Sequence, residues 1–421
     1  MLAAPNSAQA QFWKKWFKKK ETVGQQHNTG NPDIKTSNDN SGKPIKPIVR
    51  NTGRFPETTY KDRYSIDVLA PLYLDELIVD GKMVHKTSIP QKVMPAILFY
   101  EGITLAADTL KKLGYRLDIH LYDVANELES PLTLINTDQL ANSDLMIGIL
   151  SSKDFQPVAK YAKRKNINFI SALSPSDDGI LDNPYFTMLQ PTLQTHCQAL
   201  KEHMSRKYKN IPRVMLYRTN VEVDNMAFEY FSEDKYSTYI KYNCNNIPNQ
   251  EDLQPLFDNN SVNIILMPII SDDYSSQLLT KLYEWFPNMQ FEVWGMPSWN
   301  DMAALKKATT FPNVAVYYTS PYYFDASTAS GQELAKKYKA RYGSANPDKL
   351  VYRGYETMMW YAYLLKKYGS VFNEHTKDTG MAPFTRYDIR LVQDRDDNIL
   401  YNENHHLYLY RFQSGSYIVS Q

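Results

Sequence analysis

Four groups of polar residues each come directly after a short apolar segment, and their side chains fit the binding of a small polar ligand. They are Ser151-Ser152, Ser171 with Ser174, Arg218 with Thr219, and Ser271-Asp272. Hydroxyl, guanidinium and carboxylate groups together can hydrogen-bond and neutralise a charged small molecule. Ser151-Ser152 also precede a predicted helix, whose first N–H groups favour an anionic group. Any one of these serines could equally be a helix cap, but four such loops favour a shared ligand site.

Motifs for catalysis or metal binding are scarce. The chain has no G-x-G-x-x-G, P-loop, H-E-x-x-H or G-x-S-x-G motif. His196 and His203 are seven residues apart on a predicted helix, about 10 Å of rise, which is too far for one metal ion. His405-His406 lie in a predicted strand, where they would point to opposite faces. We therefore predict a non-enzymatic protein with no catalytic residue, no metal site and no cofactor. A hydrolase or transferase that uses Ser152 or a pair of adjacent aspartates is the weaker alternative.

Alternating strand and helix patterns place the four polar groups at the ends of strands. The first series is strand 66–74, helix 96–113, strand 117–122, strand 145–150, helix 155–165 and strand 168–172. This order predicts a parallel sheet with helices on both faces. Ligands of such sheets bind at the carboxyl ends of the strands, where Ser151 and Ser171 lie.

A second series of the same kind follows. It comprises helix 192–208, strand 214–217, helix 225–232, strand 239–242, helix 251–258, strand 264–268, helix 275–286 and strand 291–294. A third segment adds strand 314–319, helices 331–342 and 351–368, and the antiparallel strands 387–392 and 407–412, with a final hairpin at Gly415. The sequence therefore predicts two consecutive parallel α/β units.

The first 59 residues differ from the rest of the chain. Ala8-Gln9-Ala10 is the small-x-small pattern that signal peptidases cut, so we interpret residues 1–10 as the remnant of a signal peptide; a chance alanine-rich terminus is the alternative. Phe12–Lys20, FWKKWFKKK, interleaves lysines with aromatic residues, a composition that suits an anionic membrane surface or a solvated tail. Together with the polar residues that follow, residues 11–59 are interpreted as a basic-aromatic segment and a flexible linker.

Composition excludes several classes of protein. The chain has 421 residues, with 47 Lys and Arg against 46 Asp and Glu, so its net charge of +1 argues against a nucleic-acid partner. Two cysteines, Cys197 and Cys244, cannot form a disulfide framework, and whether they pair is left open. No segment approaches ~18 consecutive apolar residues, the length needed to span a membrane.

Residues 147–177, IGILSSKDFQPVAKYAKRKNINFISALSPSD, resemble the type I periplasmic binding proteins, in particular the leucine/isoleucine/valine-binding group. Further segments are similar to the same family: FYEGITLAADTLKKL (99–113), NPYFTMLQPTLQTHCQAL (183–200), RVMLYRTN (213–220), FEVWGMPSW (291–299), TSPYYFD (319–325), YGSANPD (342–348) and RGYETMMWYAYLL (353–365). The resemblance covers roughly residues 62–412.

The resemblance implies two doubly wound, Rossmann-like α/β lobes with parallel sheets, joined by three crossover strands, with a ligand cleft between them. Lobe 1 would comprise 60–189 plus 317–403, and lobe 2 would comprise 190–316 plus 404–421. Ser152 matches the family serine that binds the carboxylate of an amino-acid ligand, and Ser271 matches a ligand-contacting position in lobe 2. The ligand-binding residues expected from the resemblance and the loops together are Ser151, Ser152, Ser171, Leu173, Ser174, Arg218, Thr219, Ser271, Asp272 and Trp299.

Departures from the family pattern bear on the ligand. Pro175 stands where a threonine hydroxyl contacts ligand in the family, and Val223 stands where a tyrosine is usual. Pro297 replaces the acidic residue that pairs with an α-ammonium group. Because a buried cation without a carboxylate is strongly disfavoured, a substitute would be needed, such as Asp272, Asp273 or Glu356.

We therefore expect an exported protein of the periplasm or cell envelope that closes its lobes on an amino-acid-like or other small polar ligand. Its expected partner is an ABC permease or a sensor protein, with peripheral membrane contact through Phe12–Lys20. The alternative is a cell-envelope protein that uses the two-lobed scaffold for partner or cell-wall interaction.

Overall fold

The computed structural model describes residues 55–84, 89–218, 220–233, 236–242, 247–306, 311–343, 346–394 and 396–420. The interpreted signal-peptide remnant and the segment Phe12–Lys20 lie outside these residues, as do Thr219 and Cys244.

The described chain forms two compact units. The first, here called the N-terminal unit, comprises residues 55–190 and 324–406; the second unit comprises residues 191–323 and 407–420. The chain therefore passes from one unit to the other three times. The two-lobed α/β fold class that the sequence predicts is confirmed, since the sheet of each unit is mainly parallel.

The N-terminal unit contains a seven-stranded sheet in the order β13-β14-β7-β6-β5-β1-β4. The strands are β1 (Tyr64–Ala70), β4 (Leu117–Asp123), β5 (Leu145–Gly148), β6 (Asn168–Ser171), β7 (Phe186–Met188), β13 (Ile389–Gln393) and β14 (Ile399–Asn404). Only β13 and β14 pair in antiparallel fashion. Every residue of β5 and β6 is buried, as expected of central strands covered by helices on both faces.

The helices of this unit are α2 (Leu74–Leu77), α3 (Met94–Lys112), α4 (Pro131–Asn136), α5 (Ser152–Lys165), α10 (Ala329–Tyr342) and α11 (Lys349–Tyr368). A short hairpin of β2 (Ile78–Val79) and β3 (Lys82–Met83) follows α2. Helices α3 and α11 pack closely because each has a glycine at the crossing, Gly102 and Gly354. Helix α11 begins at the cap Asp348, whose side chain accepts the Leu350 N–H, and ends before Gly369.

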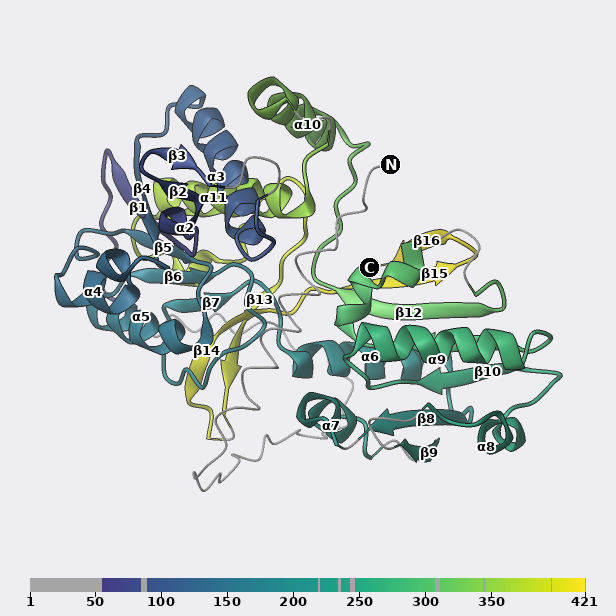
Figure 1. Ribbon diagram of the computed structural model, residues 1–421. Coiled ribbons are helices and arrows are strands. Elements are labelled where there is room, and N and C mark those ends of the chain that lie inside the picture. The colour runs from purple at the N-terminus through teal and green to yellow at the C-terminus, as the bar shows by residue number, and fades with distance from the viewer. Residues whose placement is uncertain are drawn as a thin grey trace. The chain divides into compact units, whose positions relative to one another are not determined.

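The second unit also contains a seven-stranded sheet, in the order β16-β15-β12-β11-β10-β8-β9, and Figure 1 labels all of these strands except β11. The strands are β8 (Arg213–Arg218), β9 (Ser237–Tyr242), β10 (Val262–Leu266), β11 (Gln290–Trp294), β12 (Val314–Ser320), β15 (Tyr408–Gln413) and β16 (Ser416–Ser420). The helices are α6 (Leu193–Lys207), α7 (Glu222–Glu229), α8 (Gln250–Leu253) and α9 (Asp272–Trp285). Strands β9, β8, β10, β11 and β12 pair in parallel, whereas β15 pairs with β12, and β16 with β15, in antiparallel fashion.

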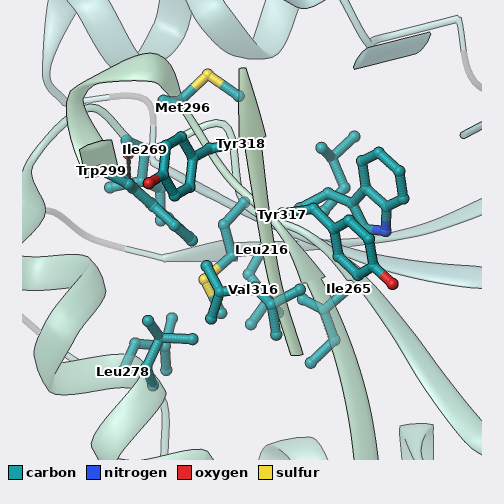
Figure 2. Close-up of a cluster of buried hydrophobic side chains, with 14 of the residues drawn as sticks. Leu216, Ile265, Ile269, Leu278, Met296, Trp299, Val316, Tyr317 and Tyr318 are labelled. Atoms are coloured by element: carbon teal, nitrogen blue, oxygen red, sulfur yellow. Dashed lines mark hydrogen bonds between the residues drawn. The ribbon is translucent and has the colours of Figure 1, made fainter. Parts of the chain in front are cut away.

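The core of the second unit lies between this sheet and its helices. Figure 2 shows part of it, with Leu216, Ile265 and Val316 contributed by β8, β10 and β12, and Leu278 by α9. All four side chains are fully buried. Apolar side chains from the strands and helices of this unit therefore meet in one core.

Two expectations about local structure are wrong, and two strands of the N-terminal unit's seven-stranded sheet were missed. The helix predicted over 251–258 is only α8, followed by a 3-10 turn at Gln254–Leu256. Pro255 lies in that turn, and a proline in an α-helix removes a backbone hydrogen bond. His405-His406 lie in the connection between β14 and β15 rather than in a strand. Strands β7 and β14 were not predicted.

No helix in the described ranges combines the length and the apolar character required to cross a membrane.

Candidate ligand-binding site

The beginning of α5 lies at the carboxyl end of the N-terminal unit's sheet. Strand β5 ends at Gly148, Ser151 is the N-cap residue, and Ser152 is the first residue of α5. The Ser151 hydroxyl does not cap the helix, because it donates to Asp154 Oδ2 at 2.5 Å. The positive end of this 14-residue helix therefore lies just after β5 and receives no side-chain oxygen from its N-cap residue.

Ser171 is the last residue of β6, and in the sheet it lies next to Gly148 of β5. Its side chain is fully buried, and its Oγ atom has no hydrogen-bond partner among the described residues. A buried hydroxyl without a partner is uncommon and costs free energy, which a bound polar group would offset. Ser171 is thus a hydroxyl with unused hydrogen-bonding capacity at the sheet edge.

The loop after β6 is shaped by its own side chains. Ser174 is buried, and its hydroxyl accepts the Ser176 N–H at 3.2 Å, so it forms a turn within the loop. Gln156 of α5 donates to the Asp178 carbonyl at 2.7 Å, which ties the loop to the helix. Leu173 is also buried. Ser174 and Leu173 therefore contribute to the position of the loop that follows Ser171.

Arg218 ends β8 in the second unit, and its guanidinium group pairs with Asp224. Arg218 Nε donates to Asp224 Oδ2 at 2.6 Å, and its guanidinium carbon lies 4.3 Å from the centre of the Tyr274 ring. Both charged side chains are buried. Burial raises the pKa of the Asp224 carboxyl, and the nearby Arg218 charge opposes that rise. The positive charge of Arg218 is therefore largely neutralised inside the unit.

Ser271 and Asp272 lie at the start of α9, which follows β10. Ser271 is the N-cap residue, and its hydroxyl accepts the Tyr274 N–H at 3.3 Å. Asp272 is buried and accepts the N–H of the exposed Asp273 at 3.0 Å. Carboxylates in the first turn favour the helix, and the same charges favour a cationic group of a ligand at this edge.

Trp299 is fully buried in the core of the second unit. Its indole Nε1 donates to the Ile269 carbonyl at 2.9 Å. A Cβ atom at Gly295 would lie 2.2 Å from the Trp299 ring, so only glycine leaves room for the indole. Trp299 thus contacts the backbone that leads to Ser271.

Glu356 was one candidate for the carboxylate that is missing at Pro297, but its side chain has other hydrogen-bond partners. It is fully buried in α11, where it accepts the N–H groups of Phe384 and Thr385 at 2.6 and 2.7 Å and the Tyr387 hydroxyl at 2.8 Å. Burial raises the pKa of the Glu356 carboxyl to about 7.

The structure thus brings the expected residues together within each unit, from neighbouring strands. In the N-terminal unit these are the ends of β5 and β6, and in the second unit the ends of β8 and β10. Sequence reasoning missed Asp224. Its only signal was an acidic residue in the first turn of a helix, which is typical of many helices.

His196 is a buried packing residue. Its Nδ1 atom lies 2.8 Å from Thr319 Oγ1, and burial lowers the pKa of His196 to about 3, so the imidazole is neutral. In the part of the chain that the structure describes, no three His, Cys, Asp or Glu side chains are placed to hold a metal ion.

The described chain thus forms two α/β units, each with a mainly parallel sheet, and passes between them three times. No protein-family model matches the chain, and no curated protein matches it.

Solved structures share the fold. One is the ABC transporter substrate-binding protein from Desulfitobacterium hafniense in complex with Leu, at a TM-score of 0.52 and 17% identity, covering 85% of this chain and 100% of that one. Another is a branched-chain amino acid ABC transporter periplasmic ligand-binding protein from Burkholderia xenovorans, at a TM-score of 0.53 and 12% identity, covering 85% and 94% of the chains.

Full-length LpoA from Haemophilus influenzae is similar at a TM-score of 0.51 and 14% identity, with 87% of this chain matched to 60% of LpoA. At these identities the likeness shows the fold alone. The resemblance to the type I periplasmic binding proteins that the sequence predicted is therefore confirmed as a shared fold.

Proposed function

We propose that this chain is an extracytoplasmic, non-enzymatic solute-binding protein that closes its two lobes on a small polar ligand. The ligand is amino-acid-like or another small polar metabolite, delivered to an ABC transporter or a sensor. Structural neighbours are named as transporter substrate-binding or ligand-binding proteins, one of them in complex with Leu, which supports the proposal.

The observation that carries this proposal is the unpaired Ser171 hydroxyl beside the start of α5. Gly148 and Ser171 are neighbours at the ends of β5 and β6, and α5 begins four residues after Gly148. A carboxylate placed there would accept the Ser171 hydroxyl and backbone N–H groups of the helix. Hydrogen bonds to a charged group are the stronger kind, so this edge would hold the anionic end of the ligand.

Acidic residues of the second unit would hold the opposite end. Asp272 and Asp273 lie at the start of α9, whereas Pro297, which the family resemblance aligns with the acidic partner of an ammonium group, has no charge to offer. With Glu356 occupied inside α11, these two aspartates are the proposed partners of a cationic group.

Native mass spectrometry of the freshly purified full chain tests this function. We expect a small-molecule adduct that disappears after unfolding and refolding, because lobe closure buries a ligand and slows its release. The mass of the adduct identifies the ligand class. An adduct-free mass, together with no heat of binding from L-leucine and a panel of amino acids, would contradict the proposal.

The alternative function is a cell-envelope protein that uses the two-lobed scaffold for a partner or cell-wall interaction. It is favoured by the shared fold with LpoA, since this fold is not confined to proteins named for transport. Retention of the full chain on purified cell-wall material, with no small-molecule adduct, would favour this alternative.

Export to the periplasm or cell envelope is part of both proposals, and it rests on Ala8-Gln9-Ala10. Fractionation of cells that produce the protein should then recover it outside the cytoplasm. The segment Phe12–Lys20 is proposed to contact the membrane surface, which vesicles with and without anionic lipid would test.

A further inference from the structure

The backbone that leads to Ser271 is held by three buried side chains from other parts of the second unit. Asp224 Oδ1 accepts the Ile270 N–H at 2.7 Å, and the Ser298 hydroxyl donates to the Ile270 carbonyl at 2.7 Å. The Trp299 indole donates to the Ile269 carbonyl at 2.9 Å, and Figure 2 shows Trp299 next to Ile269. Both polar groups of Ile270 are therefore satisfied by side chains.

Asp224 joins two neighbouring strands through its two oxygens. Oδ1 accepts the N–H of Ile270, just beyond β10, while Oδ2 accepts Nε of Arg218, at the end of β8. These strands are parallel neighbours in the sheet. Arg218 in turn lies over the Tyr274 ring, on the first turns of α9, so it also contacts the helix that Ser271 begins.

The position of Asp224 in its own helix shows that these contacts are not ordinary helix capping. Asp224 is the third residue of α7, where an acidic side chain usually stabilises the N–H groups of its own helix. Its hydrogen bonds instead reach Arg218 and Ile270, both outside α7. Because the Asp224 side chain is fully buried, losing either partner would leave part of a buried carboxylate uncompensated.

We propose that Asp224 is a positioning residue that preforms the second unit's half of the ligand site. It holds the segment Ile269–Asp272 in one conformation before ligand arrives, and it pairs Arg218 internally. Rigid support of this kind lowers the entropy that a binding site loses when it closes on a ligand. The link to ligand binding rests on the proposed function, whereas the effect of Asp224 on the segment does not.

Hydrogen exchange of the full chain, followed in a peptide covering 264–275, tests the positioning role without any ligand. In Asp224→Ala both contacts are lost, and we expect exchange in this peptide at least tenfold faster than in the wild type. In Asp224→Asn one oxygen can still accept the Ile270 N–H, so we expect a smaller increase. Residues 290–294 of β11, in the same sheet, should keep their protection in both variants.

Glu356→Gln is the matched control, because Glu356 is also a buried carboxylate that accepts backbone N–H groups, but in the other unit. It should leave exchange of the 264–275 peptide within twofold of the wild type. Unchanged exchange of that peptide in Asp224→Ala would overturn the proposal. So would equal acceleration in residues 290–294, because that pattern indicates a general loss of stability. If Asp224→Ala does not fold, exchange in the 264–275 peptide and in residues 290–294 is compared between Asp224→Asn and the wild type instead.

Calorimetric titration with L-leucine then connects the segment to the site. We expect Asp224→Asn to weaken L-leucine binding at least tenfold and Glu356→Gln to change it less than twofold. Faster exchange with unchanged L-leucine affinity would overturn the role in the ligand site. If wild-type protein shows no small-molecule adduct in native mass spectrometry and binds neither L-leucine nor another amino acid, the proposed function fails, while the exchange experiment still decides whether Asp224 positions the segment.

Discussion

The Glu356 carboxylate accepts the backbone N–H of Thr385 at 2.7 Å from within helix α11. The same carboxylate accepts the Phe384 N–H and the Tyr387 hydroxyl, so one buried side chain holds the connection between α11 and β13. Three donors around a carboxylate favour its charged form, but full burial opposes it, and burial raises the pKa to about 7.

This raised pKa predicts a pH dependence of stability. The pKa of an unfolded glutamate is about 4.5, so between pH 4.5 and 7 the folded state binds a proton that the unfolded state has lost. The stabilisation is complete below pH 4.5 and is lost as the pH rises through 7, amounting to about 3 kcal/mol. Urea unfolding of wild type and Glu356→Gln across pH 4.5–8 should show that their free energies of unfolding diverge over this window. Parallel profiles would contradict the prediction.

Gly354 should not tolerate alanine. A Cβ atom there would lie 1.9 Å from the Phe99 carbonyl oxygen, so α3 and α11 would have to separate. We expect Gly354→Ala to lower the free energy of unfolding by about 3 kcal/mol, as overpacking does. Gly81→Ala is the comparison, because Gly81 has open space but a positive φ of 70° and should cost about 1 kcal/mol. Denaturant unfolding checks both, and equal costs would argue against the helix crossing as the cause.

Ser143→Ala should lower the free energy of unfolding without changing ligand affinity. Ser171→Ala should lower ligand affinity without lowering the free energy of unfolding. Ser171 Oγ has no partner in the described fold, so its removal should leave the free energy of unfolding unchanged or slightly raised. Ser143 donates to the Leu145 carbonyl at 2.8 Å, and its loss should cost about 1 kcal/mol.

For ligand affinity, Ser171→Ala should have the larger effect and Ser143→Ala the smaller one. If the anionic end of the ligand contacts Ser171, Ser171→Ala should weaken binding about tenfold or more, since a hydrogen bond to a charged group contributes about 1.5–3 kcal/mol. Ser143→Ala should bind as wild type does. Calorimetry with the ligand identified by mass spectrometry provides the measurement, and unchanged affinity in Ser171→Ala would remove that residue from the site.

Cys197 should be unreactive in the folded protein. It is a fully buried free cysteine, and burial raises the pKa of its thiol far above the ordinary value, so little thiolate forms at neutral pH. In a Cys244→Ser variant, labelling with Ellman's reagent should be slow in buffer and fast and stoichiometric in urea. Rapid labelling without denaturant would show that α6 opens locally.

The alternation of strands and helices was predictable because it depends on local residue spacing. Apolar residues at strand and helix periods marked the central elements, such as β5 and α11. The polar β14 was not predictable, because its buried Asn402 and Glu403 look like loop residues. Asn402 is satisfied by donating to the Pro184 carbonyl at 2.9 Å, more than 200 residues away in the sequence.

For the candidate site, the sequence alone determined which loops meet at the carboxyl ends of the strands, since parallel strand order follows from the local pattern. What each side chain does there was decided only by the tertiary structure. Arg218 pairs with Asp224, Trp299 donates to the Ile269 backbone, and Ser171 keeps an unpaired hydroxyl. The physical reason is that burial and hydrogen-bond partners are supplied by neighbouring strands, which the sequence around each residue does not contain.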